Sequence, residues 1–348
     1  MAACVLRLRT GSRLHFGLLS FGRPEVPQFG GAGLMIDSPG ITLRAEPEAL
    51  DARQASDSSP SQSDWDGCSC DVAAGDSGLR ERVREFCRRW CEAEGRSFPA
   101  VRLVLEESIP EHVGLGSGTQ LGLAVAAMLY RVAGQGTPAP ELLSQAVGRG
   151  LRSSIGTFGF QQGGFLVEYG KLPDQQLSPL AARVELPEAW RVVVVRPRKT
   201  QGLFGTVEKR AFRELPAVPL ETTARLRRLL EEQMLPAAQG GELERFGAAV
   251  HAYGREAGLC FAPIQGGPFA TPELEAWVEA IRGQGVAGVG QSSWGPTLFA
   301  LVAGDSDAQR LVDWFQNGYL PSTSGRPDDA VCSIARVANR GAEWLSEA

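Results

Sequence analysis

Three glycines that alternate with other residues mark the most chemically suggestive stretch of the chain, PEHVGLGSGTQLG at residues 110–122. Gly114, Gly116 and Gly118 remove side chains where backbone N–H groups would approach an anion. The apolar segment that follows predicts a helix whose positive end points at the same place. Ser117 and Thr119 add hydroxyl donors, or serve as ordinary helix N-caps. The stretch is typical of a phosphate-binding loop.

This glycine loop differs from the two most familiar nucleotide-binding loops. A P-loop carries a lysine immediately before its Ser or Thr, and here Gly116 precedes Ser117. A dinucleotide-binding fingerprint needs a second strand soon after the helix, with an acidic residue at its end. The pattern of residues 140–150 predicts a second helix at that place.

Further polar residues are placed where they could bind phosphate groups. Arg13 and His15 alternate on a predicted strand, so both should face the same side. Glu208 is a candidate ligand for a magnesium ion that is bound to diphosphate. The alternative is that it belongs to a charged surface loop with no role in binding. A basic, hydroxyl-rich group suits a phosphate, although arginine is also favoured at a solvated helix end. This group consists of Arg149, Arg152, Ser153 and Ser154.

The bulk composition is that of a globular protein with small-molecule partners. A chain of 348 residues exceeds the usual size of a single core, so two domains are expected. A net charge of −5 makes nucleic acid and anionic membrane poor candidate partners. We find no run of about 20 apolar residues and no apolar segment of signal-peptide length, and we expect a cytoplasmic protein.

The cysteines are scattered along the chain and odd in number, seven in total. This pattern suits a reducing compartment better than a disulfide framework. A zinc site is an alternative, although a C-x-C pair is tighter than the usual structural pair. Its four thiolates would be Cys68, Cys70, Cys87 and Cys91.

Alternation and periodicity predict a mixed chain of strands and helices. We predict early strands at 3–9 and 41–46, separated by the glycine-rich segment 29–40, and a long loop at 51–78. The first domain, 1–185, should continue with a helix at 79–95, a strand at 98–108, helices at 120–134 and 140–150, and a strand at 165–170. The second, 186–348, should contain strands near 190–197, 286, 297–304 and 331, and helices near 220–235, 241–257, 272–283 and after 305.

Two passages in this order resemble signatures of the GHMP kinase superfamily. PEHVGLGSGTQLG resembles its second signature, and GVGQSSWGPTLFALV, at 288–302, resembles its glycine-rich third signature. The resemblance implies an α+β fold of two domains, with the active site in the cleft between them.

The residue that many kinases of this superfamily use as a base is missing. Such kinases place a catalytic Asp a few residues before a Gly-Gly pair, so that it can take the proton of the substrate hydroxyl. The pair here is Gly163 and Gly164, and the Asp position falls on Gly156. Between residues 149 and 169 the sequence contains a single carboxylate, Glu168, on a predicted strand. The homoserine kinase branch manages without this Asp, so a kinase remains possible.

Four passages resemble a branch that does not transfer phosphate, the β-ribofuranosylaminobenzene 5'-phosphate synthases of methanopterin biosynthesis. They are RLHFGLLSFG with GGAGLMID, GRGLRSSIGTFGFQQGGF, RPRKTQGLFGTVEKRAF and GQSSWGPT. The resemblance implies that phosphoribosyl diphosphate is joined to 4-hydroxybenzoate or 4-aminobenzoate, with release of carbon dioxide and diphosphate. Because the ring sheds its carboxylate, no base is needed to collect a proton.

The resemblance also assigns roles to these residues. Arg13 would grip a phosphate or the aryl carboxylate, and His15 would contact diphosphate or the para substituent. The alternative for these two residues is an ion pair on the strand face and a structural histidine with its hydrogen bonds satisfied. Residues of the second domain could close over the anion, with Trp294 stacked on the aryl ring. The alternative is a Trp that is buried at a domain interface. The substrate-binding residues expected there are Gln291, Ser292, Ser293, Trp294 and Gly295.

Two other functions remain open at the level of sequence. One is an ATP-dependent small-molecule kinase, and the other is a protein that binds a phosphorylated metabolite without turnover. A homodimer is expected from its general frequency among soluble proteins.

Overall fold

The computed structural model describes residues 5–48, 70–72, 76–198, 202, 205–318 and 330–346. Cys68, and with it the complete four-cysteine zinc site, lies outside the described residues, as does most of the predicted loop at 51–78.

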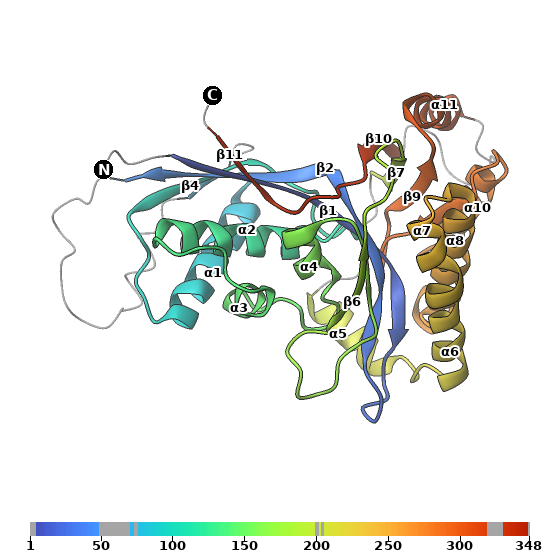
Figure 1. Ribbon diagram of the computed structural model, residues 1–348, viewed down its shortest axis with the longest axis horizontal. Helices are drawn as coiled ribbons and strands as arrows, with labels where there is room; N and C mark the ends of the chain where they lie inside the picture. The colour runs from blue at the N-terminus through green and yellow to red at the C-terminus, as the bar shows by residue number, and fades with distance from the viewer. Residues whose placement is uncertain are drawn as a thin grey trace.

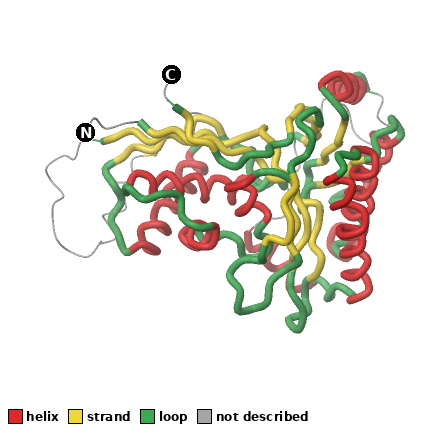
Figure 2. The backbone as a smooth tube through the Cα atoms, viewed as in Figure 1, coloured by secondary structure: helices red, strands yellow, loops and turns green. Residues whose placement is uncertain are grey.

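A seven-stranded sheet forms the first half of the molecule, with strand order β11-β1-β2-β4-β3 and with β5 pairing to β2 and β6. Figures 1 and 2 show the helices of this half gathered on one face of the sheet. The strands are β1 (Leu6–Ser20), β2 (Phe29–Pro47), β3 (Cys70–Val72), β4 (Val101–Glu107), β5 (Phe165–Glu168), β6 (Leu180–Val184) and β11 (Glu343–Leu345). The helices are α1 (Ser77–Glu94), α2 (Ser117–Val132), α3 (Pro140–Ala146) and α4 (Ile155–Gln162).

A four-stranded sheet with order β10-β7-β9-β8 forms the second half. Helix α8 packs against it and against β1, on the outer side of the molecule in Figure 1. The strands are β7 (Arg191–Pro197), β8 (Gly288–Gln291), β9 (Leu298–Val302) and β10 (Ala330–Arg336). The helices are α5 (Gly205–Glu214), α6 (Leu220–Arg228), the π-helical turn η2 (Leu229–Met234), α7 (Leu235–Gln239), α8 (Leu243–Leu259), α9 (Ala262–Gln265), α10 (Pro272–Arg282) and α11 (Asp305–Gln316).

Strand β1 joins the two halves through one core. Phe16 on β1 lies 5.2 Å from Phe299 of the second sheet and 6.2 Å from Phe165 of the first, measured between ring centroids. The change of sheet falls between β6 and β7, while β11, at the other end of the chain, pairs with β1. The division into domains 1–185 and 186–348 stays a prediction.

The predicted α+β class is confirmed, and the buried helix after the glycine loop is α2, buried along nearly its whole length. The prediction for residues 29–40 is wrong. This glycine-rich segment does not separate two strands but forms the first part of β2. The glycines let β2 approach β1 closely, because a Cβ on Gly31 would lie 2.1 Å from the carbonyl oxygen of Gly17. Helices α4 and α5 were not predicted.

Candidate functional site

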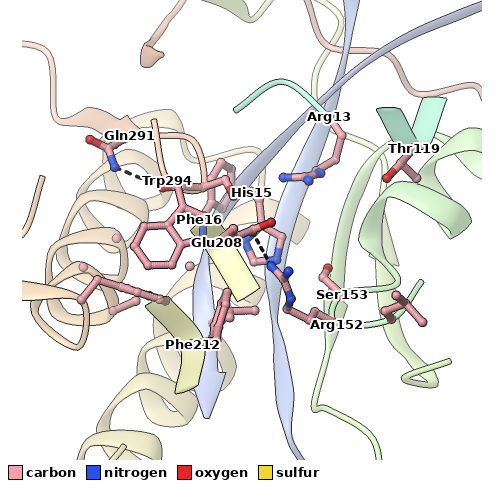
Figure 3. Close-up of a pocket in the computed structure, with 18 of the residues that line it drawn as sticks. Arg13, His15, Phe16, Thr119, Arg152, Ser153, Glu208, Phe212, Gln291 and Trp294 are labelled. Carbon is pink, nitrogen blue, oxygen red and sulfur yellow. Dashed lines mark hydrogen bonds and ion pairs between the residues drawn. The ribbon is translucent and has the colours of Figure 1, made fainter. Parts of the chain in front are cut away.

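A cavity of about 280 Å³ lies where β1, the start of α2, α5, α8 and the loop after β8 meet. Its size suits a small-molecule ligand. Figure 3 shows Arg13, Thr119, Ser153 and Arg152 along one side and Phe16, Phe212 and Trp294 along the other. The cavity therefore has a cationic end and an aromatic end.

Strand β1 carries Arg13 and His15 into the cavity from the same side, as Figure 3 shows. The strand is irregular here, with register shifts between Thr10 and Ser12 and between His15 and Gly17. Its backbone is fixed by the glycine loop, since the N–H of Arg13 donates to the carbonyl of Leu115 at 3.0 Å. The backbone that carries both side chains is thus held by the fold before any ligand arrives.

The two side chains have different charge states. Burial lowers the pKa of Arg13 to about 10, against the charges of Glu168 and Glu208, which raise it. Arg13 therefore stays cationic at neutral pH, and its Nη1 is buried without a hydrogen-bond partner. Burial, and then the charge of Arg13, holds the pKa of His15 well below its usual value. His15 is a neutral imidazole whose Nε2 is also buried without a partner.

The glycine loop ends at the first turn of α2 without a side-chain cap. Its N-cap is Gly116, with φ of 75°, so neither Ser117 nor Thr119 acts as the expected cap. A Cβ on Gly116 would lie 3.3 Å from Cβ and Nε of Arg13. The helix therefore presents uncapped N–H groups next to a buried guanidinium, which is an arrangement that favours an anion.

Two more guanidinium groups approach the same helix end. A Cβ on Gly118 would lie 2.3 Å from Nη2 of Arg82 and 3.2 Å from Nη2 of Arg149. Burial, and then the charges of Arg82 and Arg89, lower the pKa of Arg149 to about 10, against the charge of Glu208, which raises it. Arg82, which is ion-paired with Glu111, was not predicted. It lies on the amphipathic helix α1, and its charge does not distinguish it in the sequence from the other arginines there.

The segment before α4 supplies the rest of the cationic end. Arg152 is ion-paired with Glu208 of α5, and its guanidinium lies 4.4 Å from the ring centroid of Phe212. The hydroxyl of Ser153 accepts a hydrogen bond from the N–H of Ile155 at 3.2 Å. Glu208 is the one carboxylate among the described residues that line the cavity.

The loop after β8 closes the cavity from the second sheet. The hydroxyl of Ser292 donates to the carbonyl of Gly114 at 2.7 Å and accepts from the N–H of His15 at 3.1 Å. The N–H of Ser293 donates to the carbonyl of His15 at 2.9 Å. Gln291 holds the loop by accepting from the N–H of Ala270 and donating to the carbonyl of Ser293. Ser292 thus ties the glycine loop, β1 and the β8 loop together.

Three aromatic rings form the other end of the cavity. Trp294 is half-buried and packs edge-on against Phe212 and Phe261, at centroid distances of 5.5 and 4.6 Å. Phe212 and Phe261 also contact each other edge-on at 5.9 Å. Neither phenylalanine was predicted as a site residue. Phe212 ends the passage RPRKTQGLFGTVEKRAF but was not assigned a role there, and Phe261 lies between α8 and α9, where no motif was recognised. Flat, apolar walls of this kind suit an aromatic ring.

The structure brings most of the predicted site residues to one cavity. Those that line it are Arg13, His15, Thr119, Arg149, Arg152, Ser153, Glu208, Gln291, Ser293 and Trp294. Those outside its lining are Gly114, Gly116, Ser117, Gly118, Ser292 and Gly295. The latter group shapes the backbone around the cavity.

The position of the missing kinase base lies close to this cavity. Gly156 is in the first turn of α4, and a Cβ there would lie 3.2 Å from Cγ2 of Thr119, which lines the cavity. The Cβ of an aspartate at this position would lie beside Thr119, at the cationic end of the cavity. The glycine leaves that place without a proton acceptor.

The described residues contain no group of three or more His, Cys, Asp or Glu side chains arranged to hold a metal ion. Among the helices of the described part, none has the length and apolar character needed to cross a membrane.

Comparisons with known proteins agree with this fold. The family model of the GHMP kinases N terminal domain matches residues 81–158, and that of the GHMP kinases C terminal matches residues 234–319. A homoserine kinase from Cytophaga hutchinsonii superposes with a TM-score of 0.63 at 14% identity, covering 99% of this chain and 98% of that chain. A galactokinase from Lactococcus lactis gives 0.65 at 15%, covering 98% and 95%. Fold and matched models together define a protein of the GHMP kinase superfamily.

Relatives with similar sequences identify a family within this superfamily. The chain is 30% identical over 313 residues to the beta-ribofuranosylphenol 5'-phosphate synthase of Methanothermobacter thermautotrophicus, covering 85% of this chain and 88% of the relative. It is 30% identical over 363 residues to the synthase of the same name from Archaeoglobus fulgidus, covering 97% and 99%. The chain belongs to the family of these synthases, which is a family of enzymes.

Proposed function

We propose that this enzyme joins phosphoribosyl diphosphate to 4-hydroxybenzoate or 4-aminobenzoate and releases carbon dioxide and diphosphate, as a step of tetrahydromethanopterin biosynthesis. The observation that carries the proposal is the cavity itself, in which Arg13, Arg149 and Thr119 of the first turn of α2 lie across from an aromatic compartment. The name of these relatives, beta-ribofuranosylphenol 5'-phosphate synthase, favours 4-hydroxybenzoate as the aryl substrate.

The chemistry of this reaction matches the groups that are present. The bond between the anomeric carbon and diphosphate breaks, and its electron pair leaves with diphosphate. The ring carbon that bears the carboxylate gives an electron pair to the anomeric carbon. The bond to the carboxylate then breaks, and its pair restores the aromatic ring as carbon dioxide departs. No proton passes to the protein, which fits a glycine at position 156 where a kinase would need its base.

Each end of the cavity has a task in this scheme. The glycine loop, Arg13 and Arg149 stabilise the negative charge that develops on diphosphate, and such preorganised donors contribute ~3 kcal/mol each when removed singly. Arg152 and Ser153 suit the 5'-phosphate. Trp294, Phe212 and Phe261 hold the aryl ring. Neutral His15, which Figure 3 places between the two ends, offers a hydrogen bond without adding charge beside the cationic sugar.

We expect Mg2+ to enter with the diphosphate rather than as a resident ion. The cavity offers a single carboxylate among its described lining residues, Glu208, and Mg2+ in such sites is commonly bound by one or two carboxylates together with substrate phosphates. The ion would supply charge neutralisation of the leaving group. Chelation of magnesium should abolish turnover, and restored magnesium should recover it. We also propose a cytoplasmic location and a homodimer.

Incubation with carboxyl-labelled 4-hydroxybenzoate, phosphoribosyl diphosphate and magnesium should release labelled carbon dioxide and diphosphate in equal amounts. Trapping of the gas and an enzymatic assay of diphosphate measure both products. Formation of ADP from ATP and an alcohol, without labelled gas, would instead support a kinase. Binding of phosphoribosyl diphosphate without any turnover would indicate a metabolite-binding protein.

Replacement of Trp294 by alanine should raise the KM for 4-hydroxybenzoate by about fivefold or more, because an aromatic pair contributes ~1 kcal/mol beyond the area that it buries. The KM for phosphoribosyl diphosphate should stay the same, and Trp294→Phe should retain most of the affinity. Steady-state kinetics with each substrate varied separately measures the effect. Trp314→Ala, on α11 and outside the cavity lining, is the matched control. An equal rise of both KM values would contradict the assigned role.

A further inference from the structure

A buried carboxylate lies behind the cationic end of the cavity and has no part in the reaction described above. Glu168, the last residue of β5, is fully buried and does not line the cavity. Both of its oxygens accept hydrogen bonds from the N–H of Ser154, at 3.1 and 2.9 Å. Such a group is costly to bury, so its retention calls for an explanation.

Glu168 is part of a network that fixes the segment Gly150–Ser154 from behind. The ammonium group of Lys171 donates to the carbonyl of Gly150 at 2.9 Å. The N–H of Ser178 donates to the hydroxyl of Ser154 at 2.8 Å. The two ends of this short segment are therefore held by β5 and the residues after it. Between these ends lie Arg152 and Ser153, whose side chains face the cavity.

The charge of Glu168 is in equilibrium with its protonated form near neutrality. Burial raises its pKa to about 7, against hydrogen bonds from Ser153, Ser154 and Ser178 that lower it. Three other titratable groups interact with it electrostatically, Arg13 from β1, Lys171 after β5 and Tyr253 from α8. Arg13 is the group that connects Glu168 to the cavity.

We infer that Glu168 is a positioning residue that holds Gly150–Ser154 in its anion-binding conformation and that it takes up a proton when the anionic substrate binds. A phosphate beside Arg13 and Arg152 adds negative charge close to a carboxylate that burial already disfavours in its charged form. Binding and protonation therefore assist each other, as linkage requires. This inference rests on the proposed function for the identity of the anion, but not for the existence of an anion site.

The pH dependence follows from the direction of the shift. Below the pKa of Glu168 the group is neutral and does not oppose the anion, whereas above this pKa its charge repels the anion. Affinity for inorganic diphosphate in the wild-type enzyme should therefore fall, relative to that of Glu168→Gln, as pH rises from about 6 to about 8.5. The difference should reach about tenfold, as expected for two charges several ångströms apart at a partly shielded site.

Isothermal titration calorimetry with inorganic diphosphate tests the inference directly. Titrations in buffers of different ionisation enthalpy give the number of protons taken up on binding. This number should be larger in the wild type than in Glu168→Gln, and the difference should be a fraction of one proton. Glu168→Gln keeps an acceptor for Ser154, so its affinity should match that of the wild type at low pH and exceed it at high pH. Glu168→Leu removes the acceptor and should weaken binding at every pH.

Glu232→Gln, an exposed residue of η2, is the matched control and should behave as the wild type. Thermal unfolding establishes that each variant is folded. If Glu168→Gln is not folded, proton uptake by the wild type on binding of sulfate, which does not itself titrate between about pH 6 and about pH 8.5, decides instead, and its absence would overturn the inference. Equal proton uptake by the wild type and Glu168→Gln, or parallel affinity curves, would overturn the inference. Proton-linked diphosphate binding without labelled carbon dioxide would refute the proposed reaction and leave the role of Glu168 intact.

Discussion

Replacement of Arg13 by alanine should lower kcat/KM by about 100- to 1000-fold, corresponding to ~3 to 4 kcal/mol of lost transition-state stabilisation. The guanidinium is buried, carries an Nη1 without a partner and lies against the end of the glycine loop, where we propose that the leaving group binds. The effect should appear mainly in kcat, since charge on diphosphate grows during the reaction. Steady-state kinetics with phosphoribosyl diphosphate varied measures it.

Arg9→Ala provides the control for this prediction. Arg9 lies on the same strand but is exposed, and its loss should leave kcat/KM within about twofold of the wild type. Arg13→Lys should recover part of the lost rate, because an ammonium restores the charge but not the planar guanidinium. A variant that lacks Arg13 and retains wild-type kcat would contradict its assignment to the diphosphate.

Replacement of Gly114 by alanine should reduce kcat/KM by about 100-fold and lower the melting temperature by several degrees. Gly114 has a φ of 88°, and a Cβ there would lie 2.3 Å from the carbonyl oxygen of Ser292. Because the obstacle is backbone, the glycine loop and the β8 loop must move apart. This displacement would disturb His15, whose N–H and carbonyl are both held by the β8 loop.

Gly134→Ala separates backbone strain from loop displacement. Gly134 has a similar φ of 76°, but a Cβ there would meet nothing within 4 Å. Its replacement should cost about 1 kcal/mol of unfolding free energy through conformation alone, with kcat/KM unchanged. Thermal unfolding and kinetics on both variants provide the comparison. A Gly114 variant that behaves like the Gly134 variant would show that the contact with Ser292 is not needed for activity.

Local patterns in the sequence were sufficient to predict part of this site. The glycine loop and the helix after it depend on the spacing of neighbouring residues, and they could be predicted for that reason. The alternation of Arg13 and His15 is likewise local, and the cavity receives both side chains. The α+β fold followed from the order of strands and helices together with two ordered signatures.

Contacts between elements that are distant in the sequence determine the remaining parts of the site, and no local sequence pattern predicts these contacts. Arg82 reaches the start of α2 only because α1 packs beside it. Phe212 and Phe261 come together through the packing of α5 and α9 around Trp294. The glycines of β2 suggested a connection, because glycine is unfavourable in strands unless another backbone approaches closely. Another backbone does approach β2 closely in this structure, but the approach results from the pairing of β2 with β1.

The position of β1 between both ends of the chain has a consequence for biosynthesis. Its residues Arg7–Arg9 pair with β11, and His15 bonds to Ser292, a residue 277 positions away. A chain emerging from the ribosome therefore carries an open β1 edge until its final residues are released, and such edges recruit other chains. We expect premature termination before residue 343 to yield an aggregation-prone product, with the substrate cavity among the last features to form.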